Sequence, residues 1–194
     1  MAVLENKIKY GLSNVHYAKA TYDKSTNKVT YATPVPITGA VNLALKASGS
    51  KEPFYADNIE YSNVLSNNGY EGDLEIADMP QSFETDILKQ TLETTTNVLF
   101  ENGDVVEGEH FALLFQFEGD AKAIRHVFYW CSAERPEIKG KTKSDKTDPQ
   151  TDTLNFSARP APDTHDVKAK TTASTPEDKY NNWFKALVVK GTVV

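Results

Sequence analysis

Few residues of the types that carry out catalysis stand where they could act together. The single cysteine, Cys131, and the nearest histidine, His126, are the pair from which a thiol nucleophile and its base could be built. Both fall in one predicted strand, residues 124–131. Alternation of side chains along an extended strand would put them on opposite faces, roughly 16 Å apart at about 3.3 Å per residue. We therefore predict a core cysteine, a structural histidine and no catalytic residues.

Sites for metals, phosphates and nucleotides are not indicated either. One cysteine cannot form a Cys-cluster metal site. Gly140-Lys141-Thr142 ends like a phosphate-binding loop, but Arg135 stands where its first glycine is required. The chain has four histidines, His16, His110, His126 and His165. No two of them stand two or four positions apart, so a metal site formed by neighbouring histidines is not indicated. We predict no metal or cofactor, and an enzyme that uses two carboxylates from distant strands is the one catalytic class left open.

Charge is distributed unevenly along the chain. The net charge is −6, yet residues 1–50 carry +4, residues 51–120 carry −14 and residues 121–194 carry +4. Phosphate contacts need clustered Lys and Arg, so the acidic middle of the chain argues against a nucleic-acid-binding surface. Apolar runs are far shorter than the roughly 18–20 residues that span a bilayer, and we expect neither a membrane span nor a signal peptide.

Apolar and polar residues alternate in a way that predicts a mainly β fold. A length of 194 residues with 39% hydrophobic and 25% charged residues is typical of one globular domain, here residues 1–194. An α-helix is predicted at about 79–90, with Phe83 and Ile87 packed on the sheet. Period-two patterns predict strands at residues 39–45, 72–77, 111–117 and 153–158, and strand-forming runs beside turn residues predict strands at 14–20, 28–32 and 124–131.

Three other segments are not explained by a single half-buried sheet. Residues 46–68 form a long connection with many large apolar side chains, which is more typical of a binding element than of a slack linker. Residues 139–152 form a charged loop with four lysines and three aspartates. In the C-terminal segment, residues 160–194, an aromatic stretch is expected to close on the core. Residues 124–131 are apolar on both faces, and so need cover on both, from this chain or from a partner subunit.

Eight short segments stand in order over nearly the whole chain: KYGLSNVHYA at 9–18, TYATPVP at 30–36, PFYADN at 53–58, NGYEGDLEI at 68–76, FALLF at 111–115, AIRHV at 123–127, PQTDTL at 149–154 and YNNW at 180–183. Together they resemble the major tail protein family, the tail tube proteins of long, non-contractile-tailed bacteriophages (siphophages). An ordered match over most of a chain is far more specific than any one short motif.

The resemblance implies a fold and a function. The fold would be a β-sandwich or barrel-like tail-tube fold with one flanking helix, similar to the tube proteins of contractile tails and type VI secretion. The protein would be a structural virion protein without cofactors, whose hexameric rings stack into the tail tube through which DNA is ejected. The immunoglobulin-like domain that some relatives add at the C-terminus is not expected here.

The resemblance also implies partners and a location. The main partner would be the chain itself, together with the tape-measure, distal tail-tip and tail-terminator proteins. DNA would pass through the lumen without specific binding, and no membrane is involved. Assembly would take place in the host cytoplasm, and the protein would end in the virion tail.

Inter-subunit contacts are then the predicted functional residues. On the 46–68 connection, Phe54 and Tyr55 are the expected anchors. Acids of residues 51–120 facing the lumen would repel DNA, and the +4 flanks would meet acidic patches of adjacent subunits. The simpler alternative is that the 46–68 connection and the 139–152 loop are both free surface loops. The full set of contact candidates is Phe54, Tyr55, Asp57, Asn58, Lys141, Lys143, Asp145 and Lys146.

A function of another class also fits a β-sandwich. Trp130, Trp183 and the tyrosines could stack on sugars in a carbohydrate- or receptor-binding module. The position of Trp130 in the middle of a predicted strand favours a core role instead.

Overall fold

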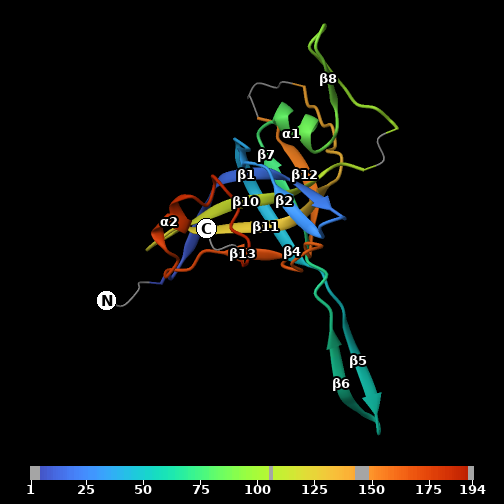
Figure 1. The fold of residues 1–194 in the computed structure, drawn as a ribbon, viewed down its shortest axis with the longest axis vertical. Coiled ribbons are helices and arrows are strands. Elements are labelled where there is room, and N and C mark those ends of the chain that lie inside the picture. The colour runs from blue at the N-terminus through green and yellow to red at the C-terminus, as the bar shows by residue number, and fades with distance from the viewer. Residues whose placement is uncertain (1–4, 105–106, 143–148, 192–194) are drawn as a thin grey trace.

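The structure is a computed structural model that describes residues 5–104, 107–142 and 149–191 (Figure 1). Antiparallel strands make up 48% of it, and it has two short helices. In chain order the elements are β1 (Lys9–Asp23), β2 (Lys28–Tyr31), β3 (Val35–Pro36), β4 (Ala40–Ala47), β5 (Lys51–Ala56), β6 (Ile59–Leu65), β7 (Tyr70–Ile76), α1 (Gln81–Asp86), β8 (Thr91–Glu93), β9 (Val98–Phe100), β10 (His110–Gly119), β11 (Ile124–Ala133), β12 (Asp152–Arg159), β13 (Lys168–Lys170) and α2 (Glu177–Asn181).

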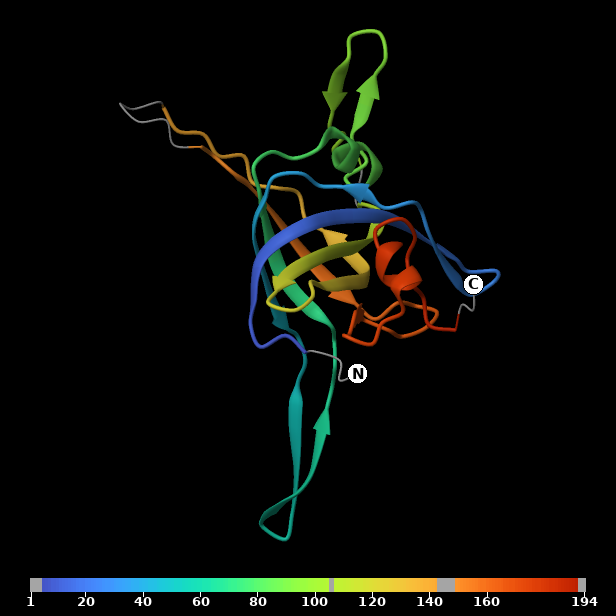
Figure 2. The same ribbon diagram turned by 90° about the vertical axis from the view of Figure 1, so that its left-hand side faces the viewer.

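Nine strands belong to one curled sheet with the order β2-β1-β10-β11-β12-β7-β4, in which β3 also pairs with β1 and β13 with β11. Strand β11 is shared between two neighbours: residues 126–128 pair with β13, and residues 130–133 pair with β12. The sheet bends there, so that β1, β10 and β11 form one layer and β12, β7 and β4 cross behind it (Figures 1 and 2). The predicted mainly β, sandwich-like fold is confirmed.

The main core lies between these two layers. Aromatic side chains of β10 and β12 meet there, with Phe111 and Phe156 at 6.5 Å between ring centroids. Helix α1 closes one end of the core, because Phe83 and Ile87 are fully buried. The flanking helix is thus confirmed, but it is shorter than residues 79–90. It ends at Asp86, and Lys89 has a positive φ of 59° that no α-helix contains.

The C-terminal segment covers the opposite face of β10 and β11. Trp183 is 5% exposed and packs there against Leu114 and Val127. The Tyr129 hydroxyl donates a hydrogen bond of 2.6 Å to the backbone oxygen of Val188. The second apolar face of residues 124–131 is therefore buried by this chain itself. The expected closure by the aromatic stretch is confirmed.

The sequence prediction was wrong for residues 46–68. They are not a loop, because β5 and β6 form a separate antiparallel hairpin that continues the β4 and β7 pair and projects from one end of the domain (Figures 1 and 2). A second hairpin, β8 with β9, projects from the opposite end (Figure 1). No helix of the described residues is long and apolar enough to cross a bilayer.

The expected separation of His126 and Cys131 on opposite faces was also wrong. Phe111 pairs with Cys131 while Leu113 pairs with Phe128, so β11 has one residue more than β10 between these pairs. Such a bulge reverses the alternation. His126 stacks on Phe115 at 5.1 Å, on the same inner face as Cys131.

His126 should make the fold acid-sensitive. Burial, with Lys170, Lys168 and Lys9 nearby, lowers the pKa of His126 from 6.5 to about 4. As the pH falls, His126 is protonated near pH 6.5 in the unfolded chain but only near pH 4 in the folded chain. The contribution of neutral His126 to folding stability is therefore fully present above about pH 6.5 and is lost as the pH falls toward 4. We expect His126→Gln to remove about 1–2 kcal/mol of the difference in unfolding free energy between about pH 7 and pH 4.5, after allowance for solvent screening.

Urea unfolding of the wild type and the variant at both pH values measures this difference. His165→Asn is the matched control, because His165 is exposed and asparagine tolerates its positive φ of 57°. Equal pH dependence in the wild type and His126→Gln would contradict the assignment.

Candidate assembly interface

The arm, defined as residues 51–65, grows out of the sheet without a break in backbone pairing. Past the β4 and β7 pair, the Ser48 amide donates to the Gly69 oxygen at 2.9 Å and the Ser66 amide donates to the Ser50 oxygen at 2.9 Å. The arm is therefore anchored through its root to two strands that bury Leu74 and Ile76 in the core.

A two-residue turn closes the arm at its tip. Ala56 pairs with Ile59, and the two residues between them, Asp57 and Asn58, have φ values of 52° and 65°. Positive φ at both central positions is the requirement of a type I′ turn, in which Asn and Asp are favoured. Two of the predicted contact residues, Asp57 and Asn58, thus form the outermost point of the arm.

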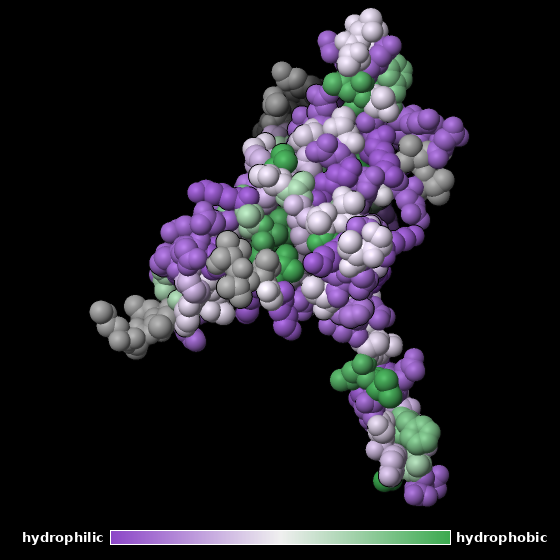
Figure 3. Space-filling view, in the orientation of Figure 1, coloured by the Kyte–Doolittle hydropathy of each residue, from purple (hydrophilic) through white to green (hydrophobic). Residues whose placement is uncertain are grey.

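Large apolar side chains of the arm are mostly exposed to solvent. Phe54 is 60% exposed and Tyr55 is 63% exposed, and the pattern continues along β6 with Ile59, Tyr61, Val64 and Leu65. Figure 3 shows these apolar groups over the arm. An isolated two-stranded hairpin is marginally stable in water, and exposed apolar patches of this kind mark interaction surfaces. The arm is the best-formed candidate interface of the described chain.

The second predicted contact segment lies elsewhere. The Lys141 amide and oxygen bond the Gln150 side chain at 3.1 and 3.0 Å, which joins the two sides of the loop. The other three candidates, Lys143, Asp145 and Lys146, lie outside the described residues. The loop leaves the domain away from the arm (Figure 2). Of this second set the structure therefore places Lys141 alone, away from the arm.

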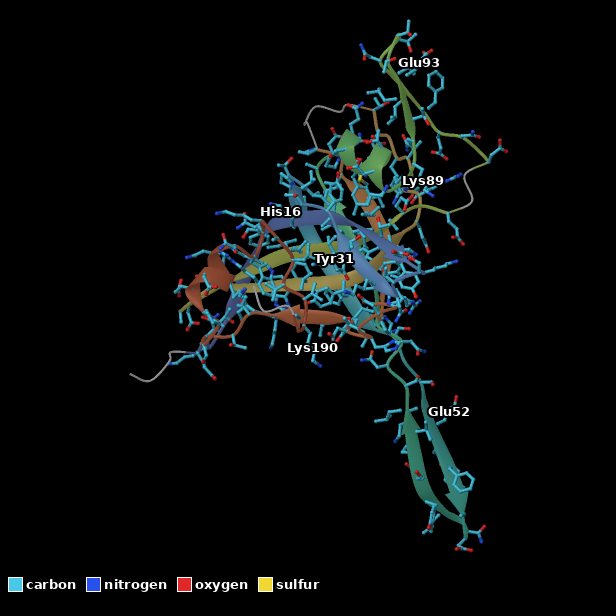
Figure 4. All side chains as sticks on the ribbon, in the orientation of Figure 1. His16, Tyr31, Glu52, Lys89, Glu93 and Lys190 are labelled. Carbon is cyan, nitrogen blue, oxygen red and sulfur yellow. The ribbon has the colours of Figure 1, made fainter. Side chains whose placement is uncertain are left out.

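The hairpin of β8 and β9 was missed by the sequence analysis. It exposes Leu92, Val98 and Phe100 at the end of the domain opposite the arm. Glu93 of this hairpin and Glu52 of the arm lie on opposite sides of the domain (Figure 4). Apolar residues on both sides of the Thr-rich stretch 94–97 were the available signal, since short strands around a four-residue polar turn form hairpins.

One edge and one face of the sheet are also open. Strand β4 ends the sheet order, and its pairing partner in that order is β7. On β7, Leu74 and Ile76 point into the core, so Glu71, Asp73 and Glu75 point outward. Their cross-strand neighbours on the same face are small or polar: Asn42, Ala44 and Lys46 on β4, and Thr153, Asn155 and Ser157 on β12.

Charged groups of opposite sign lie at the two ends of β7. At its first residue, the Lys168 ammonium donates to the Tyr70 hydroxyl at 2.5 Å, and Lys168, Lys170 and Lys9 all act on the pKa of His126. At its last residue, Ile76 pairs with Asp152. Burial, and then the nearby charges of Asp78 and Asp152, raise the pKa of Glu84 there. We call Lys9, Lys168 and Lys170 the basic end and Asp78, Glu84 and Asp152 the acidic end.

Within the described ranges, the cysteine, the tryptophans and the possible metal ligands do not form a site. Burial raises the pKa of the Cys131 thiol well above its usual range, which keeps it protonated and unreactive. Among the described residues, no group of three or more His, Cys, Asp or Glu side chains could hold a metal ion. Trp183 is buried, and Trp130 stacks on His110 at 4.0 Å between ring centroids. Neither tryptophan forms an open platform for a sugar.

Comparisons with known proteins identify the family of the chain. No curated protein matches the chain. A chain in the cryo-EM structure of the anti-feeding prophage (AFP) baseplate, 6-fold symmetrised, is similar with a TM-score of 0.44 and 10% identity, over 86% of this chain and 96% of that chain. Residues 4–109, more than half of the sequence, match the family described as phage tail tube protein, and the chain belongs to that family of structural tail proteins.

Proposed function

We propose that the protein assembles into hexameric rings that stack into the tail tube of a siphophage, the conduit for DNA ejection. The observation that carries the proposal is the arm, which exposes Phe54, Tyr55 and four further large apolar side chains on a two-stranded hairpin separate from the main sheet. Residues 1–194 act as a single tail-tube domain, assembled in the host cytoplasm with the tape-measure, distal tail-tip and tail-terminator proteins as further partners.

Lateral contacts within a ring would use the open edge of β4. Strand β4 has eight residues and no proline, and its register irregularity at Ala40–Asn42 and its one charged residue, Lys46, lie toward its two ends, so its middle carries none of the features with which monomeric proteins block edge pairing. Pairing of this edge with a strand of the next copy would extend the curled sheet around the ring.

The lumen would be lined by the outer face of β4, β7 and β12. Glu71, Asp73 and Glu75 follow one another along this face. Glu71 pairs with the Arg159 guanidinium at 2.7 Å and stands opposite Lys46, whereas Asp73 and Glu75 have uncharged cross-strand neighbours. Carboxylates without a cationic partner repel DNA phosphates, and the absence of large apolar side chains among these outward positions suits a water-filled channel better than a protein contact. The acidic stretch of the sequence would therefore let DNA pass without binding it.

Stacking would bring the basic end of one copy onto the acidic end of the next. A head-to-tail contact of this kind is heterologous and continues indefinitely, as a tube requires. Lys9, Lys168 and Lys170 would approach Asp78, Glu84 and Asp152 of the next copy, in the direction in which the arm projects.

Electron microscopy of the concentrated, purified protein tests the proposed function. Six-fold rings or tubes with an open lumen are the expected result. A protein that stays monomeric at every concentration and binds glycans saturably would overturn the proposal in favour of a carbohydrate-binding module.

Salt should slow the assembly. Oppositely charged ends steer association, and the Debye length falls from about 30 Å at roughly 0.01 M salt to about 3 Å at 1 M. We expect the rate of tube formation, followed by light scattering, to fall about tenfold over this range. The variant Lys170→Glu should assemble slowly at low salt and lose this dependence, whereas Lys24→Glu in the exposed β1–β2 turn should behave as wild type. A wild-type rate independent of salt would contradict the charge pairing.

A further inference from the structure

The arm has two faces, which the strand register defines. Cross-strand partners lie on the same face of a ribbon, and successive residues alternate. The Phe54 face consists of Glu52, Phe54, Ala56, Ile59, Ser62 and Val64. The Tyr61 face consists of Lys51, Pro53, Tyr55, Glu60, Tyr61, Asn63 and Leu65, where Tyr61 is the extra residue of a bulge between the Phe54 and Tyr55 pairs.

Side-chain contacts agree with this division. The Lys51 ammonium lies 3.8 Å from the Glu60 carboxylate, and the Asn63 amide also donates to Glu60, so these three residues share the Tyr61 face.

Both faces carry large apolar side chains beside their polar ones, and both are open. On the Phe54 face, Phe54, Ile59 and Val64 are each about 60% exposed. On the Tyr61 face, Tyr61 is 69% and Leu65 is 74% exposed. A ribbon that docked on one surface would keep polar residues on its outer face, as half-buried sheets do, whereas apolar residues on both faces are the pattern of a sheet covered on both sides.

The small size of the arm also favours contacts on both of its faces. Strands β5 and β6 have six and seven residues, and one face presents about half of them. A standard protein interface takes roughly 20–30 residues a side. Docking through a single face would therefore leave a small contact and a second apolar face in water.

We infer that each arm inserts between two adjacent copies of this chain, which cover its Phe54 face and its Tyr61 face respectively. The inference rests on the proposed stacking of rings. In a closed ring the number of junctions between neighbours equals the number of subunits, so one arm from each subunit of the adjoining ring fills every junction. Each arm then ties two neighbours together, and it strengthens the ring as well as the stack.

Matched variants of the two faces test the inference. Ile59→Ala with Val64→Ala alters only the Phe54 face, and Tyr61→Ala with Leu65→Ala alters only the Tyr61 face. We expect each double variant to stay a folded monomer and to raise the critical concentration for tube formation at least tenfold. Tube formation unchanged by either double variant would overturn the two-sided contact while leaving the proposed tube intact.

Photo-crosslinking distinguishes one neighbour from two. Val64 and Leu65 are consecutive residues on opposite faces, so p-benzoylphenylalanine at either position probes one face each. Chains labelled at one or both positions are polymerised with a large excess of unlabelled chain and irradiated. Single labels should give covalent dimers with different crosslinked peptides, and the double label should give covalent trimers. Only dimers from the double label would mean that one copy contacts the arm, and would overturn the inference. Absence of tubes from the unlabelled wild type would instead refute the proposed function.

Discussion

Truncation of Phe54 and Tyr55 to alanine is expected to abolish tube formation at concentrations at which the wild type assembles. Buried aromatic anchors of interfaces cost about 2 kcal/mol or more each on truncation. Two such losses amount to about 4 kcal/mol, which raises the critical concentration nearly a thousandfold. Sedimentation of polymer over a concentration series measures the effect.

The same change should leave the monomer intact. Both side chains are about 60% exposed on a hairpin outside the main sheet, and exposed substitutions shift unfolding free energies by no more than about 0.5 kcal/mol. The matched control is Phe54→Leu with Tyr55→Phe, which keeps the apolar bulk and should assemble nearly as the wild type does. Normal tubes from the alanine double variant would show that the arm is a free surface hairpin.

The arm also shows where sequence patterns stop being informative. Strands such as residues 72–77 could be predicted because one face, with Leu74 and Ile76, is buried in the core, and burial of one face imposes period-two alternation. Strands β5 and β6 have apolar residues on both faces, so the alternation is absent, and Pro53 argues further against a strand. The register of Pro53 with Asn63 is possible because a two-stranded hairpin consists of edge strands only.

The candidate site could be predicted only in part. Phe54 and Tyr55 were identified from composition, and the structure adds Ile59, Tyr61, Val64 and Leu65 as side chains exposed beside them. Which residues share a face of the arm follows from the strand register and the bulge at Tyr61, and a sequence pattern specifies neither of them. The bulge in β11 has the same consequence for His126 and Cys131: one extra residue reverses every side chain beyond it.

Polar outward residues were equally hard to assign. The acids of residues 51–120 were expected to act together, but the fold separates them. Glu71, Asp73 and Glu75 lie on one strand face, whereas Asp78 and Glu84 lie at the α1 end. Charge counted along the chain cannot distinguish a lumen wall from a stacking surface, because sheet order decides which residues are neighbours.

Gly69→Ala is expected to destabilise the domain and misdirect the arm. Gly69 stands where the arm meets the sheet, with a φ of +93°, and an added Cβ would lie 1.9 Å from the Ala158 backbone oxygen. That oxygen belongs to β12, which pairs with β7 beside it, so the clash can be relieved only by moving one strand from the other. Left-handed strain of about 1–2 kcal/mol adds to the loss of pairing, and we expect unfolding free energy to fall by about 3 kcal/mol.

Gly103→Ala separates this effect from that of glycine replacement in general. An added Cβ at Gly103 meets no atom within 4 Å, and φ there is not in the left-handed region. Alanine should stabilise that position by about 0.4–1 kcal/mol through the unfolded chain. Urea unfolding measures the unfolding free energy of the two variants. Electron microscopy without denaturing concentrations of urea shows whether each variant forms tubes. Since the arm leaves the sheet through Gly69, folded Gly69→Ala should assemble poorly although every apolar side chain of the arm is retained. Equal stability of the two variants would show that β12 yields to the methyl group. Normal tubes from Gly69→Ala would show that the direction of the arm is set beyond its root, by the copies that receive it.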